Sequence, residues 1–241
     1  MNGFDERTKE ALDQNLLDKL RNNRFCVVGC GGTGANFAEM LVRTGATELD
    51  LIDGEVVKRS DLNRVFAYSE FECDENKAIA LEKRLRDIRP GELSIQAFSS
   101  HLKTPEQAEN GSETNDSIRN AIKNAYAVFI AIDNRDGRLL TERLCREEGS
   151  GRYLSCGVRI NPTNNEIRFL CNWIPNSPEK DENYVELGYG PRNGSFASIV
   201  MEASSVAFTM LLAHLHNPRS EFLKYSKSYD AEFYPELPRI N

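Results

Sequence analysis

The sequence predicts an α/β fold with a mostly parallel sheet and helices on both of its faces. Short apolar segments, each about the length of a strand, alternate with segments of helical periodicity along most of the chain. This alternation is typical of strand–helix–strand units, whose parallel strands are buried on both faces. A glycine-rich turn, "GCGGTG", joins the first apolar segment to the helix that follows it, which is a connection typical of such folds.

The predicted elements follow from this pattern in order. Strands are expected at residues 24–29, 47–53, 93–98, 125–133, 152–160 and 166–174. Helices are expected at residues 9–21, 35–44, 75–90 and 136–148, with a further helix before residue 125 and an apolar, buried one at 195–215. The polar segments 99–117 and 217–241 are interpreted as a surface insertion and a tail.

The composition argues against several classes of protein. The formal charge of −7 argues against general binding of nucleic acids. A run of about 18 apolar residues is absent, so we expect no segment that spans a membrane. The first residues lack the apolar stretch of a signal peptide, and the cysteines form no C-x-x-C pair, so we interpret them as reduced thiols. We therefore expect a cytoplasmic protein.

The glycine-rich turn predicts a nucleotide site in a Rossmann-like fold. In "GCGGTG", Gly29 permits the tight turn, Gly31 lets the backbone approach a phosphate, and Gly34 lets the helix pack on the strand; Gly32 completes the loop. Asp53 lies 19 residues beyond Gly34, at the end of the second strand, where a carboxylate accepts hydrogen bonds from ribose. This loop alone leaves NAD and ATP as alternatives.

Three downstream residues distinguish these alternatives. Arg64 and Lys77 are suited to a triphosphate, because adenylyl transfer must stabilise the charge that develops on phosphate oxygens, whereas a hydride transfer has no such need. Taken singly, each is better explained as a solvated surface base, whereas the two together, at this spacing after Asp53, favour the triphosphate. Asp133 closes the fourth strand at the sheet edge and is a candidate Mg²⁺ ligand; the alternative is that Asp133 or Asn134 caps the next helix.

These features together resemble the ThiF/MoeB superfamily of adenylating enzymes, which includes the ubiquitin-activating enzymes. The family pattern is a G-x-G-G-x-G loop, a D-x-D/E-x-V-x-x-S-N-L-N/Q-R-Q segment, a downstream Lys and an Asp that ends a later strand. The chain has "GCGGTG", then "DGEVVKRSDLNRV", then Lys77 and Asp133. The resemblance runs from about residue 4 to 215 and is strongest at 24–85.

The resemblance implies ATP-dependent adenylation of the C-terminal glycine of a small ubiquitin-like or sulfur-carrier protein, by a homodimer that uses Mg²⁺. It implies the following roles: Asp53 holds the ribose, Glu55 and Asn63 line the nucleotide site, Arg64 and Lys77 hold the phosphates, Asp133 binds Mg²⁺, and Arg7 reaches the γ-phosphate across the dimer interface. It also implies a single adenylation domain at 1–241, with a nucleotide-binding half at about 22–150, a substrate-binding half with a crossover loop at about 151–215, and a tail at 216–241.

The sequence departs from the family pattern at three points. Asp61 replaces the Asn of S-N-L, and Val65 replaces the Gln after the Arg. The paired C-x-x-C motifs are absent, so we expect no zinc. The loop at 174–193 has no cysteine, and the remaining candidates for a thioester, Cys171 and Cys156, are better explained as buried thiols. Two alternatives to the adenylating enzyme stay open: a non-catalytic nucleotide-binding subunit of such an enzyme, and an NAD-dependent oxidoreductase.

Overall fold

The structure is a computed structural model that describes residues 3–103, 113–149, 152–161, 166–175, 197–217 and 224–229. Towards the carboxyl end it describes only the backbone of residues 157–161, 166–175 and 224–229. The α-helices are α1 (Glu6–Ala11), α2 (Gln14–Arg21), α3 (Gly32–Thr44), α4 (Lys77–Ile88), α5 (Glu113–Asn124), α6 (Arg135–Glu147) and α7 (Ala197–His216). The strands are β1 (Arg24–Val28), β2 (Glu48–Ile52), β3 (Ser94–Phe98), β4 (Ala127–Ile130), β5 (Arg152–Asn161), β6 (Glu166–Pro175) and β7 (Lys224–Tyr229). Three 3-10 helices are η1 (Gly3–Asp5), η2 (Arg59–Asp61) and η3 (Glu70–Glu72).

The strands form one seven-stranded sheet in the order β3-β2-β1-β4-β5-β6-β7. The five strands from β3 to β5 are parallel, whereas β6 and β7 run antiparallel to their neighbours. The strand order reverses between β1 and β4, because β2 and β3 lie on one side of β1 and β4 lies on the other. In open α/β sheets, ligands bind at such a reversal, beyond the carboxyl ends of the strands. The predicted mostly parallel sheet is confirmed.

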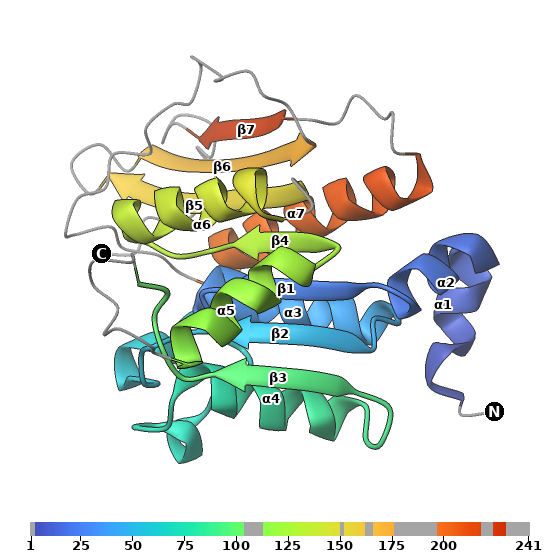
Figure 1. Cartoon of the computed structure of the whole chain (residues 1–241), viewed down its shortest axis with the longest axis horizontal. Coiled ribbons are helices and arrows are strands. Elements are labelled where there is room, and N and C mark those ends of the chain that lie inside the picture. Colours follow the sequence, from blue (N-terminus) through green and yellow to red (C-terminus); the bar gives the residue numbers. More distant parts are fainter. Residues whose placement is uncertain are drawn as a thin grey trace, which may run out of the picture.

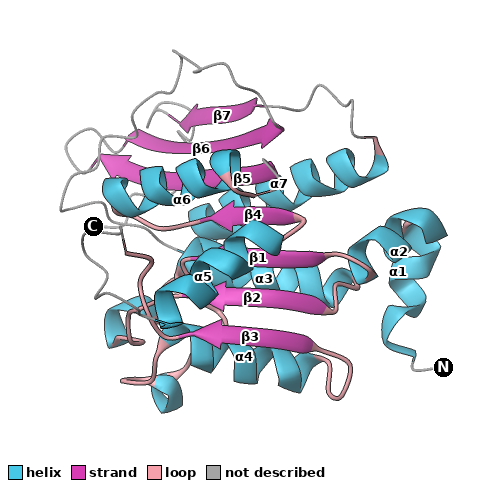
Figure 2. Ribbon diagram, in the orientation of Figure 1, coloured by secondary structure: helices cyan, strands magenta, loops and turns pink. Residues whose placement is uncertain are grey.

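Helices cover both faces of this sheet, as Figure 1 and Figure 2 show. Helices α5 and α6 lie on the face nearer the viewer, and α3, α4 and α7 lie behind the sheet. Each face has its own buried cluster: Val27 and Leu51 face α3 and α4, whereas Val28 and Ile52, their neighbours along the strands, face α5 and α6. The central strands β1, β2 and β4 therefore bury both sides, which explains their nearly continuous apolar sequences, whereas the edge strand β3 keeps Ser94 and Gln96 exposed.

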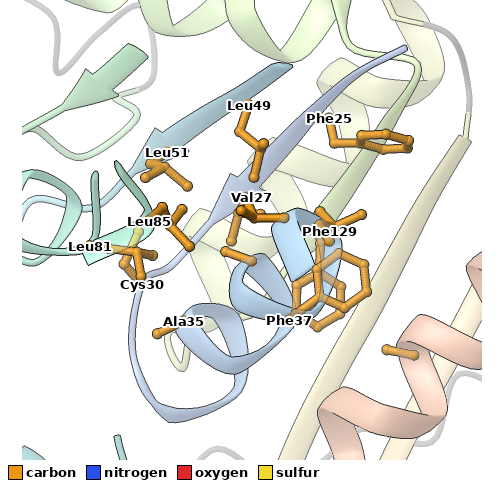
Figure 3. Packing of buried hydrophobic residues seen from close by; sticks show 14 of the residues in the cluster. Phe25, Val27, Cys30, Ala35, Phe37, Leu49, Leu51, Leu81, Leu85 and Phe129 are labelled. Carbon is orange, nitrogen blue, oxygen red and sulfur yellow. The ribbon is translucent and has the colours of Figure 1, made fainter. Parts of the chain in front are cut away.

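The core behind the sheet is centred on α3. Phe37 of α3 stacks on Phe129 of β4 with ring centroids 3.9 Å apart, as Figure 3 shows. The edge of Phe208 of α7 packs on the same Phe37 ring, at 6.1 Å between centroids. These contacts tie the helix that follows the glycine-rich loop to β4 and α7, so the loop has a rigid support.

The structure differs from the sequence prediction at the amino end. The single helix expected at 9–21 is two helices, because Asp13 has an extended backbone and its carboxylate accepts the N–H of Leu16 at 2.9 Å. Such an N-cap starts a new helix instead of continuing the previous one.

Two further differences lie outside the parallel sheet. Helix α5 begins at Glu113, inside the segment interpreted as an insertion, and residues 104–112 lie outside the described part. Strand β7 lies in the segment interpreted as a tail. Its residues, "KYSKSY", pair with β6 by backbone hydrogen bonds, and their polar side chains give no sign of this pairing. The loop expected at 174–193 overlaps the end of β6 at residues 174 and 175, and the rest of it lies outside the described residues.

Helix α7 is long and apolar enough to cross a membrane by length and composition alone, with a mean hydropathy of 1.5 over its most apolar window. The sequence criterion of an unbroken apolar run did not detect it. Half of that window is buried inside the protein. Ile199, Ala203 and Leu211 belong to the core behind the sheet, where α7 packs against α3. Burial in this core accounts for the apolar character of α7.

Candidate active site

The glycine-rich loop turns sharply between β1 and α3. Gly29 has a φ of +95°, which strongly favours glycine, and its N–H donates to the carbonyl of Ile52 at 2.8 Å. A Cβ on Gly34 would lie 1.8 Å from the carbonyl oxygen of Gly29, so only glycine permits this approach of α3 to the strand end. A Cβ on Gly31 would meet nothing within 4 Å. The loop is thus tightly packed at both ends and open in the middle.

The open middle of the loop fits a phosphate. Gly31 is the N-cap of α3 and supplies no side-chain hydrogen bond to the first turn of the helix. The first backbone N–H groups of a helix have no partner within it, and the helix dipole favours an anion there. The loop therefore offers N–H donors where a phosphate oxygen can approach the backbone closely.

Asp53 joins this loop to the end of β2. One carboxylate oxygen accepts the N–H of Cys30 at 2.7 Å, and the other accepts the N–H of Glu55 at 2.8 Å. Burial raises the pKa of Asp53, while these two hydrogen bonds oppose the rise. A carboxylate has about four lone-pair positions, so two remain available to ribose hydroxyls after both backbone bonds are made.

Lys77 lies at the start of α4, buried next to two carboxylates. Its Nζ is 2.8 Å from Oε2 of Glu55 and 3.4 Å from Oδ2 of Asp61. Burial alone would lower the pKa of Lys77, but the hydrogen bond to Glu55 and the charges of Asp53 and Asp61 raise it above its ordinary value. The Lys77 side chain is only 7% exposed, so its charge is held inside the site rather than solvated.

Arg64 converges on the same carboxylate from the other side. Its guanidinium donates to Oδ1 of Asp61 at 2.8 Å, to the carbonyl of Ser60 at 2.5 Å and to Oδ1 of Asn63 at 3.0 Å. A Cβ on Gly32 would lie 3.4 Å from Cγ of Arg64, which places the stem of Arg64 beside the first turn of α3. The structure thus brings both predicted phosphate ligands together around Asp61.

Of the two residues that the sequence offered as the cap of the next helix, Asn134 takes that role in the structure. Asn134 is the N-cap of α6, with its side chain accepting the N–H of Gly137 at 2.7 Å. Asp133 is exposed, and within the described ranges its carboxylate makes no hydrogen bond or ion pair. A Cβ on Gly29 would lie 2.8 Å from the carbonyl oxygen of Ala131, so the segment that leads to Asp133 lies against the glycine loop. Asp133 therefore follows a segment that packs against the loop, and its carboxylate is unpaired within the part of the chain that the structure describes.

Tyr68 is a site residue that the sequence analysis did not single out. Its buried hydroxyl lies 2.7 Å from the carbonyl oxygen of Cys30 and 2.9 Å from that of Lys77, and it can donate its single proton to either. It connects the glycine loop to the first residue of α4. An aromatic residue between two motif positions carries no sequence signal for this role.

Arg138 is the second residue missed, and it joins the carboxyl end of β4 to the middle of β5. Its guanidinium donates to the carbonyl of Ile132 at 2.6 Å, to the carbonyl of Cys156 at 2.8 Å and to Oγ of Ser155 at 2.6 Å. Ser155 in turn donates to the buried carboxylate of Glu142 at 2.9 Å. The sequence offered one signal for Arg138: it is a charged residue one turn into a helix, at the edge of the sheet where ligands bind.

The remaining candidates lie elsewhere. Arg7 is 92% exposed on α1, pairs with Glu10 at 2.9 Å, and belongs to a helix beside the amino ends of the parallel strands, away from the loop (Figure 1). The Cys156 thiol is buried and lies 3.9 Å from the carbonyl of Ala203 in α7. Cys171 is the partner of Cys156 in the register of β5 and β6, and its side chain lies outside the described residues.

A metal site built from protein side chains alone is absent from the described ranges. Nowhere in them do three or more His, Cys, Asp or Glu side chains converge in a way that could hold an ion. Mg²⁺ is commonly bound by one or two carboxylates together with substrate phosphates. The isolated carboxylate of Asp133 fits this second arrangement.

The fold and the loop are typical of nucleotide-binding α/β domains, with the candidate site at the carboxyl edge of the parallel strands. The particular kind of domain follows from comparison with known families. The chain belongs to the ThiF family, which it matches over residues 5–228.

Curated relatives are consistent with this membership. The chain is 28% identical over 159 residues to ubiquitin-like modifier-activating enzyme 5 of Bombyx mori, a match that covers 65% of this chain and 39% of the relative. It is 30% identical over 152 residues to SUMO-activating enzyme subunit 2 of Dictyostelium discoideum, which covers 60% of this chain and 21% of the relative. The match thus spans about two fifths or less of these relatives' length.

Solved structures share the fold at lower sequence identity. Escherichia coli MccB, in a crystal structure with ATP, superposes with a TM-score of 0.69 at 16% identity, covering 90% of this chain and 65% of that one. The structure of PaaA superposes with a TM-score of 0.71 at 13% identity, covering 95% of this chain and 84% of that one. The predicted ThiF/MoeB-type fold is therefore confirmed.

Proposed function

We propose that the protein is an Mg·ATP-dependent adenylyltransferase that activates the C-terminal carboxylate of a small ubiquitin-like or sulfur-carrier protein. The observation that carries this proposal is the convergence of Arg64 and Lys77 beside the glycine loop and Asp53. An oxidoreductase needs the loop and Asp53 but has no use for two cations there. The relatives named above support the proposal, since they are activating enzymes by name.

The proposed reaction needs no side-chain nucleophile. An oxygen of the substrate carboxylate attacks the α-phosphorus of ATP, a bond from carboxylate oxygen to phosphorus forms, and the bond to the pyrophosphate oxygen breaks. The products are an acyl-adenylate and pyrophosphate. Arg64, Lys77 and the amides of the loop stabilise the negative charge that shifts onto pyrophosphate, and Asp53 holds the ribose. Mg²⁺, when bound by Asp133 and the phosphates, neutralises part of the same charge.

The proposed assembly is a cytoplasmic homodimer. Arg7 is too far along the sheet from its own loop to serve it, since α1 lies at the amino ends of the strands (Figure 1). An exposed arginine in that position is suited to the site of a second copy. The γ-phosphate is the part of ATP that it would contact.

ATP–pyrophosphate exchange tests the reaction directly. We expect exchange that requires Mg²⁺ and a candidate protein ending in Gly-Gly, and that falls at least about a hundredfold in Lys77→Met and in Asp133→Ala. Lys83→Met is the matched control, because Lys83 is an exposed lysine on the same helix that pairs with Glu75. Its exchange rate should equal that of the wild type.

The outcomes separate the alternatives. ATP binding without exchange for any Gly-Gly protein would favour the non-catalytic subunit. Tight binding of NAD without binding of ATP would contradict the proposal and restore the oxidoreductase alternative.

A further inference from the structure

The cations of the proposed site are already paired in the absence of nucleotide. Arg64 and Lys77 both contact Asp61, at 2.8 and 3.4 Å, and Lys77 also contacts Glu55 at 2.8 Å. With Asp53, three carboxylates stand against two cations in this part of the site. A triphosphate that enters it meets cations whose charge is balanced, rather than two free positive groups.

Asp61 is the fixed member of this group. Its side chain is 4% exposed, and Oδ2 accepts the backbone N–H of Lys58 at 3.0 Å, which ties Asp61, the last residue of η2, to the N-cap of that helix. Glu55, by contrast, is 48% exposed and is screened by solvent. Asp61 is therefore the buried carboxylate that contacts both cations.

The position of Arg64 shows the effect of this pairing. The stem of Arg64 lies beside the first turn of α3, yet its guanidinium is turned back to Asp61, Ser60 and Asn63 within its own loop. Each of these partners is a hydrogen-bond acceptor, as a phosphate oxygen would be. A phosphate at the loop must draw the guanidinium away from them.

We propose that Asp61 is a built-in competitor of the nucleotide, a carboxylate that occupies Arg64 and Lys77 until the triphosphate takes both cations from it. This inference rests on the proposed function, since it names the residue that limits the affinity of the same site. It makes the site weak for any polyphosphate unless a divalent cation offsets the charge of Asp61. Binding of Mg²⁺ and ATP together is thereby favoured over binding of ATP alone.

The substitution Asp61→Asn tests the proposal while keeping the shape of the side chain. The Asn oxygen can still accept the N–H of Lys58, so η2 is retained, but the negative charge is lost. We expect calorimetric titration with Mg·ATP and with inorganic tripolyphosphate to show binding at least about tenfold tighter than in the wild type. Glu70→Gln is the control, because Glu70 pairs with Arg59 at 3.0 Å on the exposed surface, and it should leave both affinities unchanged.

A double-mutant cycle makes the test specific for the paired cations. In an Arg64→Gln background, the gain from Asp61→Asn should shrink, because one of the two cations released by the substitution is gone. A gain of the same size in both backgrounds would contradict the role of Arg64, and weaker binding in Asp61→Asn alone would show that Asp61 positions the cations instead of competing for them.

The binding results with Mg·ATP and with tripolyphosphate distinguish this inference from the proposed function. Tighter binding of tripolyphosphate with no binding of ATP would support the competing carboxylate and overturn the nucleotide assignment. Equal binding of Mg·ATP by the wild type and by Asp61→Asn would overturn the inference and leave the adenylyltransferase proposal standing.

Discussion

Two glycines of one loop meet different surroundings. Gly34 touches the backbone of Gly29, where a methyl group cannot fit, whereas a methyl group on Gly31 would extend into open space. The backbone of Gly31 is extended, with a φ of −77°, so alanine can adopt it without strain. Gly34 therefore serves the fold, and Gly31 leaves open the space that a phosphate would need.

Alanine at each glycine should separate these roles. We expect Gly34→Ala to lower the free energy of unfolding by at least about 3 kcal/mol, because α3 must move off the strand end. Gly31→Ala should stay within about 1 kcal/mol of the wild type and should weaken ATP binding, since the methyl group occupies the phosphate approach. Urea unfolding and calorimetry measure the two effects. Normal ATP affinity in Gly31→Ala would contradict this assignment of the phosphate position.

At the scale of elements, one carboxylate fastens the amino-terminal segment to the body. Asp5 of η1 accepts two hydrogen bonds from Arg89, at 3.0 and 3.1 Å, and one from Arg21 at 2.5 Å. Arg89 is the C-cap of α4, and both it and Asp5 have side chains only 6% exposed. Burial alone would raise the pKa of Asp5, but the hydrogen bonds from Arg89 and Arg21 lower it below its ordinary value of 3.8.

Removal of Arg89 should weaken this attachment in a pH-dependent way. We expect Arg89→Ala to cost about 3 kcal/mol at pH 7, the lower end for a broken buried pair, because Arg21 still faces Asp5. A carboxyl whose pKa is lowered by folding stabilises the protein above its unfolded pKa and loses that effect as the pH falls through the folded value. The difference between the variant and the wild type should therefore shrink below about pH 4 in urea titrations.

Arg43→Ala is the matched control for this prediction. Arg43 is 51% exposed and pairs with Glu39 at 3.1 Å on the surface of α3. Its removal should cost less than about 0.5 kcal/mol at either pH. Equal costs for the two variants at pH 7 would show that the Asp5 cluster is no stronger than a surface pair.

At the scale of the whole molecule, the separation of Arg7 from the glycine loop predicts that two copies share each site. Arg7→Ala and Lys77→Met should each be inactive as pure dimers. When they are mixed and allowed to exchange subunits, one site in each mixed dimer combines an intact Lys77 with an intact Arg7 from the other copy. Random mixing of subunits should restore about a quarter of the wild-type rate of ATP–pyrophosphate exchange per subunit.

Sedimentation and activity measured on the same mixture check this prediction. The proteins should sediment as dimers. A mixture of Lys77→Met with Arg64→Gln should restore nothing, because each subunit of the mixed dimer then carries a defect in its own site. A monomer in sedimentation, or full activity in Arg7→Ala, would contradict a shared site.

Local sequence predicted much of this protein. The glycine loop, Asp53, Arg64 and Lys77 could be predicted to lie in one candidate site, because turns, strand ends and helix starts constrain residue type over short distances. The family, the parallel sheet and most strands followed from the same signals. Strand β7 did not, because an edge pairing made by backbone hydrogen bonds leaves little pattern in polar side chains.

The tertiary structure alone decided how these residues are paired. The sequence shows Asp61 only as an added charge near the phosphates, whereas the fold places it between Arg64 and Lys77, which come from a loop and a helix. Tyr68 and Arg138 likewise join segments that are distant along the chain. Electrostatic and hydrogen-bond energies depend on distances of a few ångströms between side chains, and only the packed chain fixes those distances.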